Sequence, residues 1–289
     1  MERNDVEVVV GPGAVLGEGP VWDERIGRLV WVDIVGNVVH ITDTATGDTR
    51  QIPVSENIGA VVPRAAGGYL AALRDGFWIL NEDDARRVVD VGPYPGLRFN
   101  DGKCDPLGRF WAGTIVETEN TPAAALYCLN RDMELSLELN DITVSNGLAW
   151  SHDGETMYYI DTPTRRIDAI SFDLETGAIS GRRPYIDLPA DVGYPDGMTI
   201  DAEGALWIAL WDGAAIHRYV DGVLERVIGM PVTRPTSVAF GGSRYDELFV
   251  TSASMGLTEQ QLADQPLAGA LFRVTTDVGG VAPSVFGSS

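Results

Sequence analysis

Four side chains that carry oxygen atoms stand in similar local sequences. They are Glu18 in LGEGPVWD, Asn100 in RFNDGKCD, Asn146 in SNGLAWS and Asp196 in YPDGMTID. Carboxylate and amide oxygens suit Ca²⁺, Mg²⁺ or Mn²⁺, and oxygen sites can also hold Zn²⁺. A single Asp-Gly or Asn-Gly pair is more often a turn than a ligand, and YPDGMTID by itself is expected to be a loop tip that leads into a buried strand. A cation site therefore requires a fold that brings these four side chains together.

A short apolar strand recurs six times along the chain. The copies are RLVWVDI (28–34), GYLAAL (68–73), RFWAGT (109–114), TMYYIDT (156–162), ALWIAL (205–210) and ELFVTS (247–252). Successive copies are 40, 41, 47, 49 and 42 residues apart, and a second strand follows each of them. Repeats of roughly 40 to 50 residues are typical of propeller blades, which pack radially around a channel. The pattern predicts an all-β, six-bladed β-propeller that forms a single domain over residues 1–289, with negligible helix.

The N-terminal segment VEVVV is an additional strand that belongs to none of the six copies. It could complete the last blade and close the ring, which would leave little exposed strand edge. An all-β sandwich is the alternative architecture, but a sandwich would not explain why the strand pairs come at a nearly constant period.

Each recurring strand is preceded by another apolar segment that begins 10 to 12 residues before the position used for the alignment. These segments are predicted to be the innermost strands. Their first residues, called the ring residues below, are Glu18, Ile58, Asn100, Asn146, Asp196 and Thr236. Equivalent positions in a propeller lie at one height around the channel, so the four oxygen-bearing ring residues are predicted to converge on a central-channel site for one divalent cation. Without a cation, carboxylates crowded in such a sheltered place would repel each other.

Other catalytic chemistries have little support in the sequence. The three histidines, His40, His152 and His217, are scattered and form no HExxH motif, and no GxSxG motif is present. Cys104 and Cys128 show no metal-binding spacing and are expected to be buried thiols.

The overall charge and the hydropathy pattern limit the possible partners. The formal net charge is −21, which argues against binding to nucleic acid or to an anionic membrane. No apolar run approaches the roughly 18 residues of a membrane span. The first residues, MERNDVEVVV, are acidic, whereas a signal peptide begins with a basic segment. We therefore expect a cytoplasmic protein with a small-molecule ligand, present as a monomer or a small homo-oligomer.

The ordered motifs LGEGPVWD, RFNDGKCDPLGRFWAGT, SNGLAWS, YPDGMTIDAEGALWIAL and LAGALFRV resemble the gluconolactonase/regucalcin family, also called senescence-marker-like proteins. The resemblance extends from about residue 15 to about residue 275. It implies a six-bladed propeller with one divalent metal in the channel, which agrees with the architecture that the repeats predict.

The resemblance also implies roles for individual residues. The family's metal ligands fall on Glu18, Asn146 and Asp196 of this sequence. Arg98 and Asn100 match residues that contact substrate hydroxyls or the carbonyl oxygen, although a surface ion pair is the alternative for Arg98.

A glutamate shortly after AGT is a further substrate contact in some relatives. In this chain the run is GTIVETEN, so that role falls on Glu117, with Glu119 as the alternative. Three aromatic residues near the predicted channel mouth, Phe99, Tyr194 and Trp211, are expected to pack in the core or at the rim rather than to stack on a sugar ring.

The reaction that the resemblance implies is hydrolysis of a sugar lactone to an aldonic acid. The metal would polarise the lactone carbonyl, and Asp196 would serve both as a metal ligand and as the base that activates water. Arg98 and Asn100 would orient the polyol. Two alternatives are an organophosphate or other ester hydrolase of a related propeller type and a non-catalytic calcium-binding propeller. A polyol-binding pair beside the metal favours an enzyme, because an ion buffer has no need of it.

Overall fold

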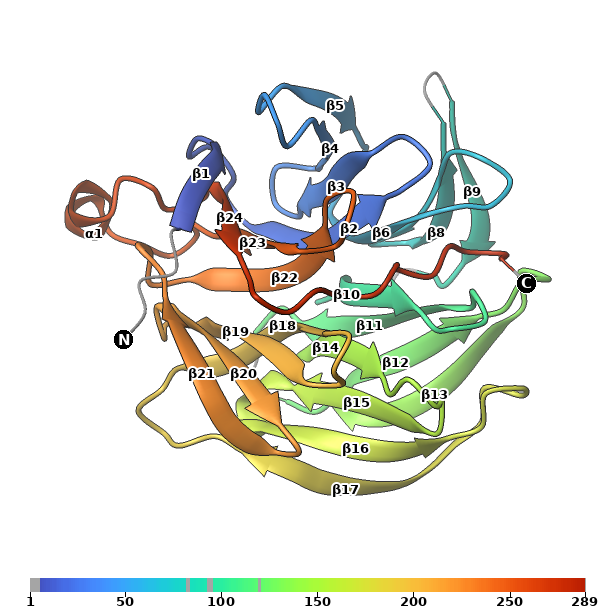
Figure 1. Ribbon diagram of the computed structural model, residues 1–289. Coiled ribbons are helices and arrows are strands. Elements are labelled where there is room, and N and C mark those ends of the chain that lie inside the picture. The colour runs from blue at the N-terminus through green and yellow to red at the C-terminus, as the bar shows by residue number, and fades with distance from the viewer. Residues whose placement is uncertain (1–5, 82–83, 93–95, 119–120, 289) are drawn as a thin grey trace.

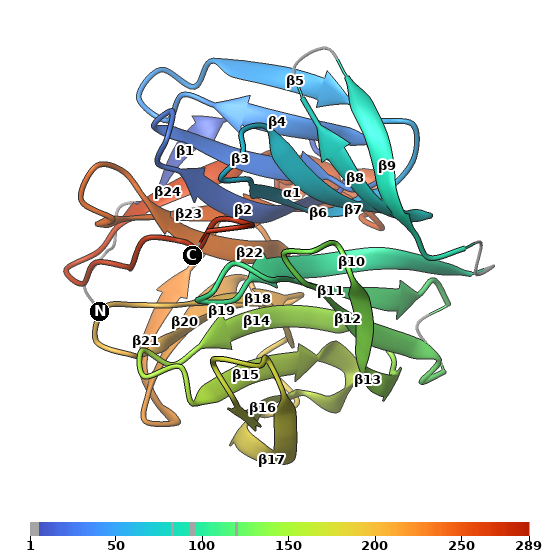
Figure 2. The same cartoon turned by 90° about the vertical axis from the view of Figure 1, so that its right-hand side faces the viewer.

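The computed structural model describes residues 6–81, 84–92, 96–118 and 121–288. These residues form six four-stranded antiparallel sheets (Figures 1 and 2). The first strand of each sheet contacts the corresponding strands of both neighbouring sheets, and the sixth contacts the first. The ring of six blades confirms the predicted six-bladed β-propeller.

The blades follow the chain in order. Blade 1 contains β2 (Gly17–Asp23), β3 (Arg28–Asp33), β4 (Val38–Thr42) and β5 (Thr49–Pro53). Blade 2 contains β6 (Ile58–Pro63), β7 (Tyr69–Leu73), β8 (Gly76–Leu80) and β9 (Ala85–Asp90). Blade 3 contains β10 (Leu97–Cys104), β11 (Phe110–Val116), β12 (Ala124–Leu129) and β13 (Leu135–Ile142).

The second half of the chain builds the other three blades. Blade 4 contains β14 (Ser145–Trp150), β15 (Thr156–Asp161), β16 (Arg166–Phe172) and β17 (Ile179–Asp187). Blade 5 contains β18 (Tyr194–Ile200), β19 (Leu206–Trp211), β20 (Ala215–Val220) and β21 (Val223–Gly229). Blade 6 contains β22 (Pro235–Gly241), β23 (Glu247–Ser252), β24 (Leu271–Thr275) and β1 (Val6–Val10). The strands nearest the axis, β2, β6, β10, β14, β18 and β22, are called the inner strands below.

The two ends of the chain share blade 6. Strand β1 pairs antiparallel with β24, with Val6 opposite Val274 and Val8 opposite Phe272. In Figure 1 the blue β1 lies beside the red β24. The N-terminal strand therefore completes the last blade, as the sequence predicts.

Helix is scarce in the described residues. It consists of α1 (Glu259–Asp264), between β23 and β24, and the 3₁₀ turn η1 (Thr162–Thr164). Thr258 caps α1 by accepting a hydrogen bond from the Gln261 backbone N–H. Neither helix in the described part of the chain has the length and apolar character that a membrane crossing requires.

The segment that holds Asp196 is a strand, and the expectation of a loop tip was wrong. Tyr194–Ile200 forms β18, and the pairing of β18 with β19 shifts register between Pro195 and Met198. All six inner strands carry such a bulge at or beside their ring residue. A bulge re-aims side chains without ending the strand, which lets Asp196 project from within a sheet.

Three of the glycines that follow ring residues, Gly59, Gly147 and Gly197, have no room for a side chain because the blades pack closely there. A Cβ atom on Gly197 would lie 2.0 Å from Ser237 Oγ of β22, and a Cβ atom on Gly59 would lie 2.5 Å from the carbonyl carbon of Phe99 in β10. The Asp-Gly and Ile-Gly pairs thus mark positions where two inner strands approach each other, rather than turns.

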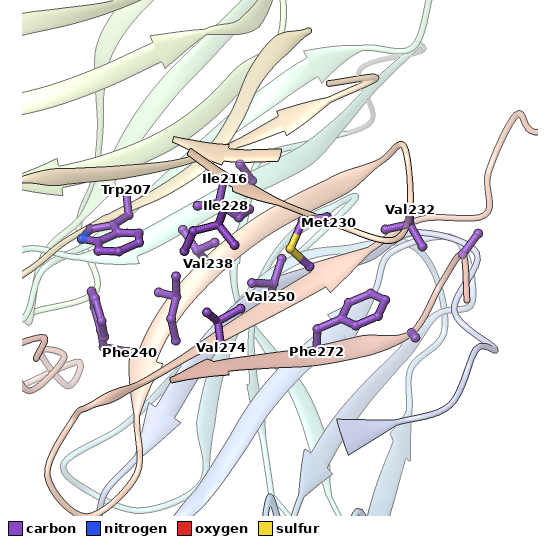
Figure 3. Packing of buried hydrophobic residues seen from close by; sticks show 14 residues of the cluster. Trp207, Ile216, Ile228, Met230, Val232, Val238, Phe240, Val250, Phe272 and Val274 are labelled. Carbon is purple, nitrogen blue, oxygen red and sulfur yellow. The ribbon is translucent and has the colours of Figure 1, made fainter. Parts of the chain in front are cut away.

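Apolar side chains fill the spaces between neighbouring blades. Between blades 5 and 6, the Trp207 and Phe240 rings meet edge to face, with centroids 5.8 Å apart (Figure 3). Val238, Val250 and Phe272 lie in the same buried cluster. This inter-blade packing fixes the angle between blades and therefore the position of the ring residues.

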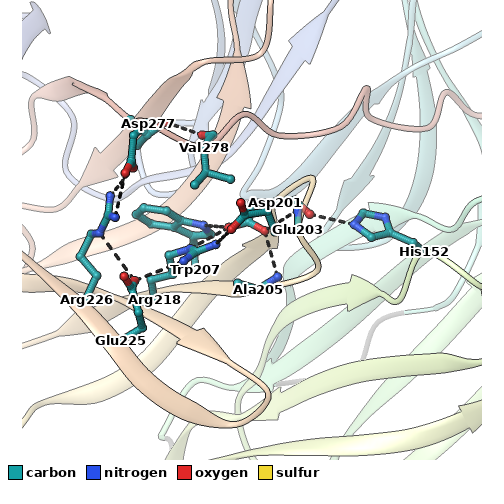
Figure 4. A network of polar contacts seen from close by, with 11 residues as sticks. His152, Asp201, Glu203, Ala205, Trp207, Arg218, Glu225, Arg226, Asp277 and Val278 are labelled. Carbon is teal, nitrogen blue, oxygen red and sulfur yellow. Dashed lines mark hydrogen bonds and ion pairs between the residues drawn. The ribbon is translucent and has the colours of Figure 1, made fainter.

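A polar network lies at the end of β18 (Figure 4). The Asp201 carboxylate is fully buried and accepts hydrogen bonds from Trp207 Nε1 at 2.8 Å and Arg218 Nε at 2.8 Å. It also accepts hydrogen bonds from the backbone N–H groups of Glu203 and Ala205. Asp201 thus links the turn after β18 to strands β19 and β20 in the interior of blade 5.

Residues 276–288, called the C-terminal tail below, run from β24 across the blades beside the axis (Figure 1). Gly280 forms an isolated antiparallel bridge with Asp201, and Phe286 forms a parallel one with Arg64. Phe286 is buried. The C-terminal tail therefore joins blade 5 to blade 2 across the end of the channel.

Candidate active site and metal centre

One end of the channel contains a cavity of about 410 Å³, called the upper cavity. Its walls include five residues singled out in the sequence: Glu18, Arg98, Asn100, Asn146 and Asp196. They come from four inner strands, β2, β10, β14 and β18. All are buried except Arg98, which is half-buried. The fold therefore brings residues 178 positions apart in the sequence into one cavity.

The hydrogen bonds of Asn146 fix the orientation of its amide. Its Nδ2 donates to Thr162 Oγ1 at 2.8 Å, and the Thr162 hydroxyl donates to the Pro195 carbonyl at 2.8 Å. Because the nitrogen is engaged with Thr162, the oxygen is the acceptor end of the Asn146 amide. It accepts one hydrogen bond, from Asn100, and has a second lone pair for a cation.

Asn100 has the opposite orientation. Its Nδ2 donates to the Ser145 carbonyl at 2.9 Å and to Asn146 Oδ1 at 3.1 Å, and its Oδ1 accepts a hydrogen bond from Arg98 Nη1 at 2.8 Å. Arg98 Nη1 also donates to the Phe99 carbonyl at 3.0 Å. Asn100 thus lies level with the candidate metal ligands along the channel. Its oxygen is bonded to Arg98, and the two residues form a polar pair on the cavity wall.

Glu18 has an unusual electrostatic environment. Burial raises the pKa of Glu18 to about 8, and the nearby Asp101 carboxylate adds to this rise. The Gly19 backbone N–H, which donates to Glu18 Oε2 at 2.9 Å, and the Arg98 guanidinium oppose it. A cation in the upper cavity would favour the charged form of this carboxyl.

The donor set fits one hard divalent cation. In the part of the chain that the structure describes, no group of three or more His, Cys, Asp or Glu side chains is placed to hold a metal. The candidate ligands are instead two carboxylates, Glu18 and Asp196, and the Asn146 amide oxygen. Two carboxylates balance a charge of two, and a set made only of oxygens suits Ca²⁺, Mg²⁺ or Mn²⁺ better than a soft metal.

Glu117 lies apart from this group. Its carboxylate pairs with Arg74 Nη2 at 2.5 Å, and Arg74 also donates to Asn57 Oδ1 at 2.8 Å. Arg74 and, more weakly, Arg98 lower the pKa of Glu117. Glu117 is exposed and is not among the residues that line the upper cavity. The alternative, Glu119, lies outside the described residues.

The three aromatic residues differ in position. Phe99 is buried in the core, where its ring meets the Phe77 ring at 5.0 Å. Tyr194 and Trp211 line the upper cavity, and each has a guanidinium over its ring, from Arg165 and Arg234 respectively. Phe99 therefore packs in the core, and Tyr194 and Trp211 pack at the rim.

Three polar residues at the channel were not predicted from the sequence. Thr162 and Asp212 line the upper cavity, but they stand directly after the second strand of their blades, where the six copies share no residue type. Asp101 could have been found from the sequence. It directly follows Asn100, whereas Glu18, Asn146 and Asp196 are each followed by glycine, so a carboxylate at this position stands out.

Comparison with known proteins identifies the family of this chain. The family described as the SMP-30/gluconolactonase/LRE-like region matches residues 16–254. Regucalcin of Xenopus laevis is 39% identical over 300 residues, with 99% of each chain covered. A Bacillus subtilis protein named "Putative sugar lactone lactonase" is 38% identical over 279 residues, which cover 94% of this chain and 95% of that protein.

Among solved structures, the fold matches that of a calcium-binding protein, regucalcin, from Agrobacterium tumefaciens. The TM-score is 0.94 at 28% sequence identity, with 98% of both chains covered. The match extends over nearly the whole length of each protein, so the similarity includes all six blades and not the motifs alone. From its sequence and its fold, this chain belongs to the SMP-30/gluconolactonase/LRE-like family.

Proposed function

We propose that this protein hydrolyses a sugar lactone to the aldonic acid, with one divalent cation held by Glu18, Asn146 and Asp196. The observation that carries the proposal is one cavity in which two buried carboxylates and an oriented amide oxygen lie beside the Arg98–Asn100 pair. The ligand set suits a cation, and the polar pair suits hydroxyl and carbonyl oxygens of a polyol. The lactonase name of the Bacillus subtilis relative supports the same reaction.

The bound cation would act as a Lewis acid that polarises the lactone carbonyl. Asp196 accepts a proton from the attacking water while the water oxygen forms a bond to the carbonyl carbon. The ring C–O bond then breaks, and Asp196 returns the proton to the departing alkoxide. Arg98 and Asn100 hold the substrate oxygens so that the carbonyl faces Asp196. Glu117 is proposed as a rim contact, made by the carboxylate oxygen that does not pair with Arg74.

The test is a panel of five- and six-carbon sugar lactones and one phosphotriester, assayed by proton release with and without a chelator. We expect lactone turnover that is lost with chelator and restored by added Ca²⁺, Mg²⁺, Mn²⁺ or Zn²⁺. Preference for the phosphotriester would favour the ester-hydrolase alternative. Tight cation binding without turnover of any compound would favour the calcium-binding alternative, which the name of the Agrobacterium tumefaciens relative suggests.

Glu18→Gln and Asn146→Ala are each expected to weaken cation binding by roughly tenfold or more, because even the loss of a group that only supports a ligand costs about 10- to 100-fold in affinity. Calorimetric titration with Ca²⁺ measures the effect. Glu117→Gln is the matched control, since it removes a carboxylate outside the cavity and should leave the Kd for Ca²⁺ unchanged. Wild-type affinity in both site variants would mean that the cation site lies elsewhere.

Arg98→Ala is expected to raise KM by roughly 10- to 100-fold, the effect of losing a charge-assisted hydrogen bond, with a smaller change in the Kd for the cation. Steady-state kinetics at saturating cation give KM. Arg98→Lys keeps the charge but lacks the planar guanidinium, so it should recover only part of the loss. A variant with normal KM and lost cation binding would contradict the assigned role.

The cellular context stays a prediction. The net charge of −21 argues against nucleic acid as a partner. We propose a cytoplasmic enzyme that works as a monomer or a small homo-oligomer within one propeller domain over residues 1–289.

A further inference from the structure

The channel contains a second cavity, of about 130 Å³, called the lower cavity. Glu18 and Asn100 line the upper cavity, and the residues that follow them, Gly19 and Asp101, line the lower one. The two cavities therefore succeed each other along the inner strands. At its other side the lower cavity is lined by residues 281–284 of the C-terminal tail.

Asp101 brings an unexpected charge into the lower cavity. Four inner strands have glycine directly after the ring residue, β22 has Ser237, and β10 has Asp101. Asp101 is buried, and its Oδ1 accepts a hydrogen bond from the Gly102 backbone N–H at 2.7 Å. It is close enough to Glu18 to raise the pKa of that carboxyl. A third carboxylate thus lies directly beneath the candidate metal centre.

Lys103 lies two residues farther along β10 and also lines the lower cavity. Its Nζ donates a hydrogen bond at 2.6 Å to the Met198 carbonyl of β18, so the side chain reaches across the channel. Met198 is two residues after Asp196 on the same strand. Burial lowers the pKa of Lys103, and Asp101 opposes this shift.

The charges of these groups divide into two balanced sets. One divalent cation would balance Glu18 and Asp196 in the upper cavity, and the Lys103 ammonium balances Asp101 in the lower one. Without Lys103, the Asp101 carboxylate would line the lower cavity with no cation beside it, and the Met198 carbonyl would lose the donor that it has now. Both are oxygen donors of the kind that a hard cation takes. An uncompensated carboxylate in such a place would attract a cation.

Building on the metal centre proposed above, we propose that Lys103 is a resident cation of the channel, which occupies the place of a second divalent ion and so limits the channel to one. The protein carries this positive charge on its own chain, at a fixed position. A divalent ion therefore has one binding position along the channel, in the upper cavity.

The test compares cation stoichiometry in the wild type and in Lys103→Met, which keeps an unbranched side chain one atom shorter and removes its charge. Equilibrium dialysis with Ca²⁺ and with Mn²⁺ should give one equivalent for the wild type and two for the variant. The double variant Asp101→Asn/Lys103→Met is the matched control. It removes the charge pair together and should return to one equivalent.

Whereas Lys103→Met is expected to increase cation binding, Asp101→Asn alone is expected to weaken it. It leaves the Lys103 ammonium without its carboxylate beneath the upper cavity, so the affinity for Ca²⁺ should fall by about tenfold through repulsion between like charges. Calorimetric titration measures this change. The Asp101→Asn arm decides the question if Lys103→Met fails to fold, as judged by circular dichroism.

The outcomes separate this inference from the proposed function. A wild type that binds no divalent cation would overturn the metal centre and this inference with it. A wild type that binds one ion and a folded Lys103→Met variant that also binds one would overturn only the role of Lys103. Unchanged Ca²⁺ affinity in Asp101→Asn would likewise overturn that role.

Discussion

Asp196→Asn is expected to produce a folded protein whose turnover stays low by roughly 10²-fold or more even at saturating cation, the scale of losing a general base. Asparagine keeps the size of the side chain and one oxygen donor but cannot accept the proton of water. Cation affinity should fall as well, because one carboxylate ligand is lost, but added cation should restore occupancy. The value of kcat at saturating Ca²⁺, with occupancy checked by calorimetry, measures the effect.

Glu18→Gln is the matched comparison for this experiment. Both variants replace a buried carboxylate of the upper cavity by its amide, but only Asp196 is assigned a proton-transfer role. High cation should therefore restore kcat in Glu18→Gln and leave it low in Asp196→Asn. If both variants recover fully, Asp196 is a ligand only, and another group must accept the proton from water.

Asp201→Ala is expected to lower the free energy of unfolding by about 3–5 kcal/mol, the range for breaking a buried ion pair by removing one partner. The substitution would leave the Arg218 guanidinium, which is 4% exposed, without its main buried acceptor. It would also leave the Trp207 indole N–H and two backbone N–H groups without their partner. Unfolding in urea, followed by circular dichroism, measures the change.

Two further variants show whether burial of the charge explains this loss. Asp153→Ala removes an exposed turn carboxylate that accepts hydrogen bonds from Ser151 Oγ and the Glu155 backbone N–H, and should lower stability by only about 1 kcal/mol. Asp201→Ala/Arg218→Met removes both buried charges and should be more stable than Asp201→Ala alone. A single Asp201 variant that unfolds at the wild-type urea concentration would contradict the importance given to the network in Figure 4.

The blade architecture could be predicted from the sequence because each blade repeats the same local strand pattern. The recurring strands at Leu29, Tyr69 and Phe110 fall in β3, β7 and β11, the second strand of each blade, and the segments before them are the inner strands. The position of the additional strand VEVVV could be predicted as well, because β24 of the last blade needs a partner strand where the two ends of the chain meet. The repeat period determines the number and the order of these strands, and that period can be read from a single sequence.

The environment of Asp196 shows what local patterns miss. The Asp-Gly pair favours a turn by its own propensity, but Gly197 lies against Ser237, 40 residues later, and this contact requires a strand with a bulge. The contact exists only after blades 5 and 6 have packed. No rule based on neighbouring residues could predict it.

Asn100 shows a second limit. Register alone placed it with the candidate ligands, whereas its hydrogen bonds to Arg98, Ser145 and Asn146 turn its oxygen away from them. The orientation of an amide depends on partners from two blades. The sequence can predict the height of a side chain in the channel, but not which of its atoms faces the axis.

The pairing of β1 with β24 has a consequence for biosynthesis. Strand β1 is the first part of the fold to leave the ribosome, but its partner begins at Leu271. At about 5–20 residues per second, β1 must wait on the order of tens of seconds before that partner has been translated. During this interval the segment is an unpaired, valine-rich strand, and a truncated nascent chain would never cover it. Protection of this segment by a chaperone, or its transient pairing elsewhere, would then determine the yield of closed rings.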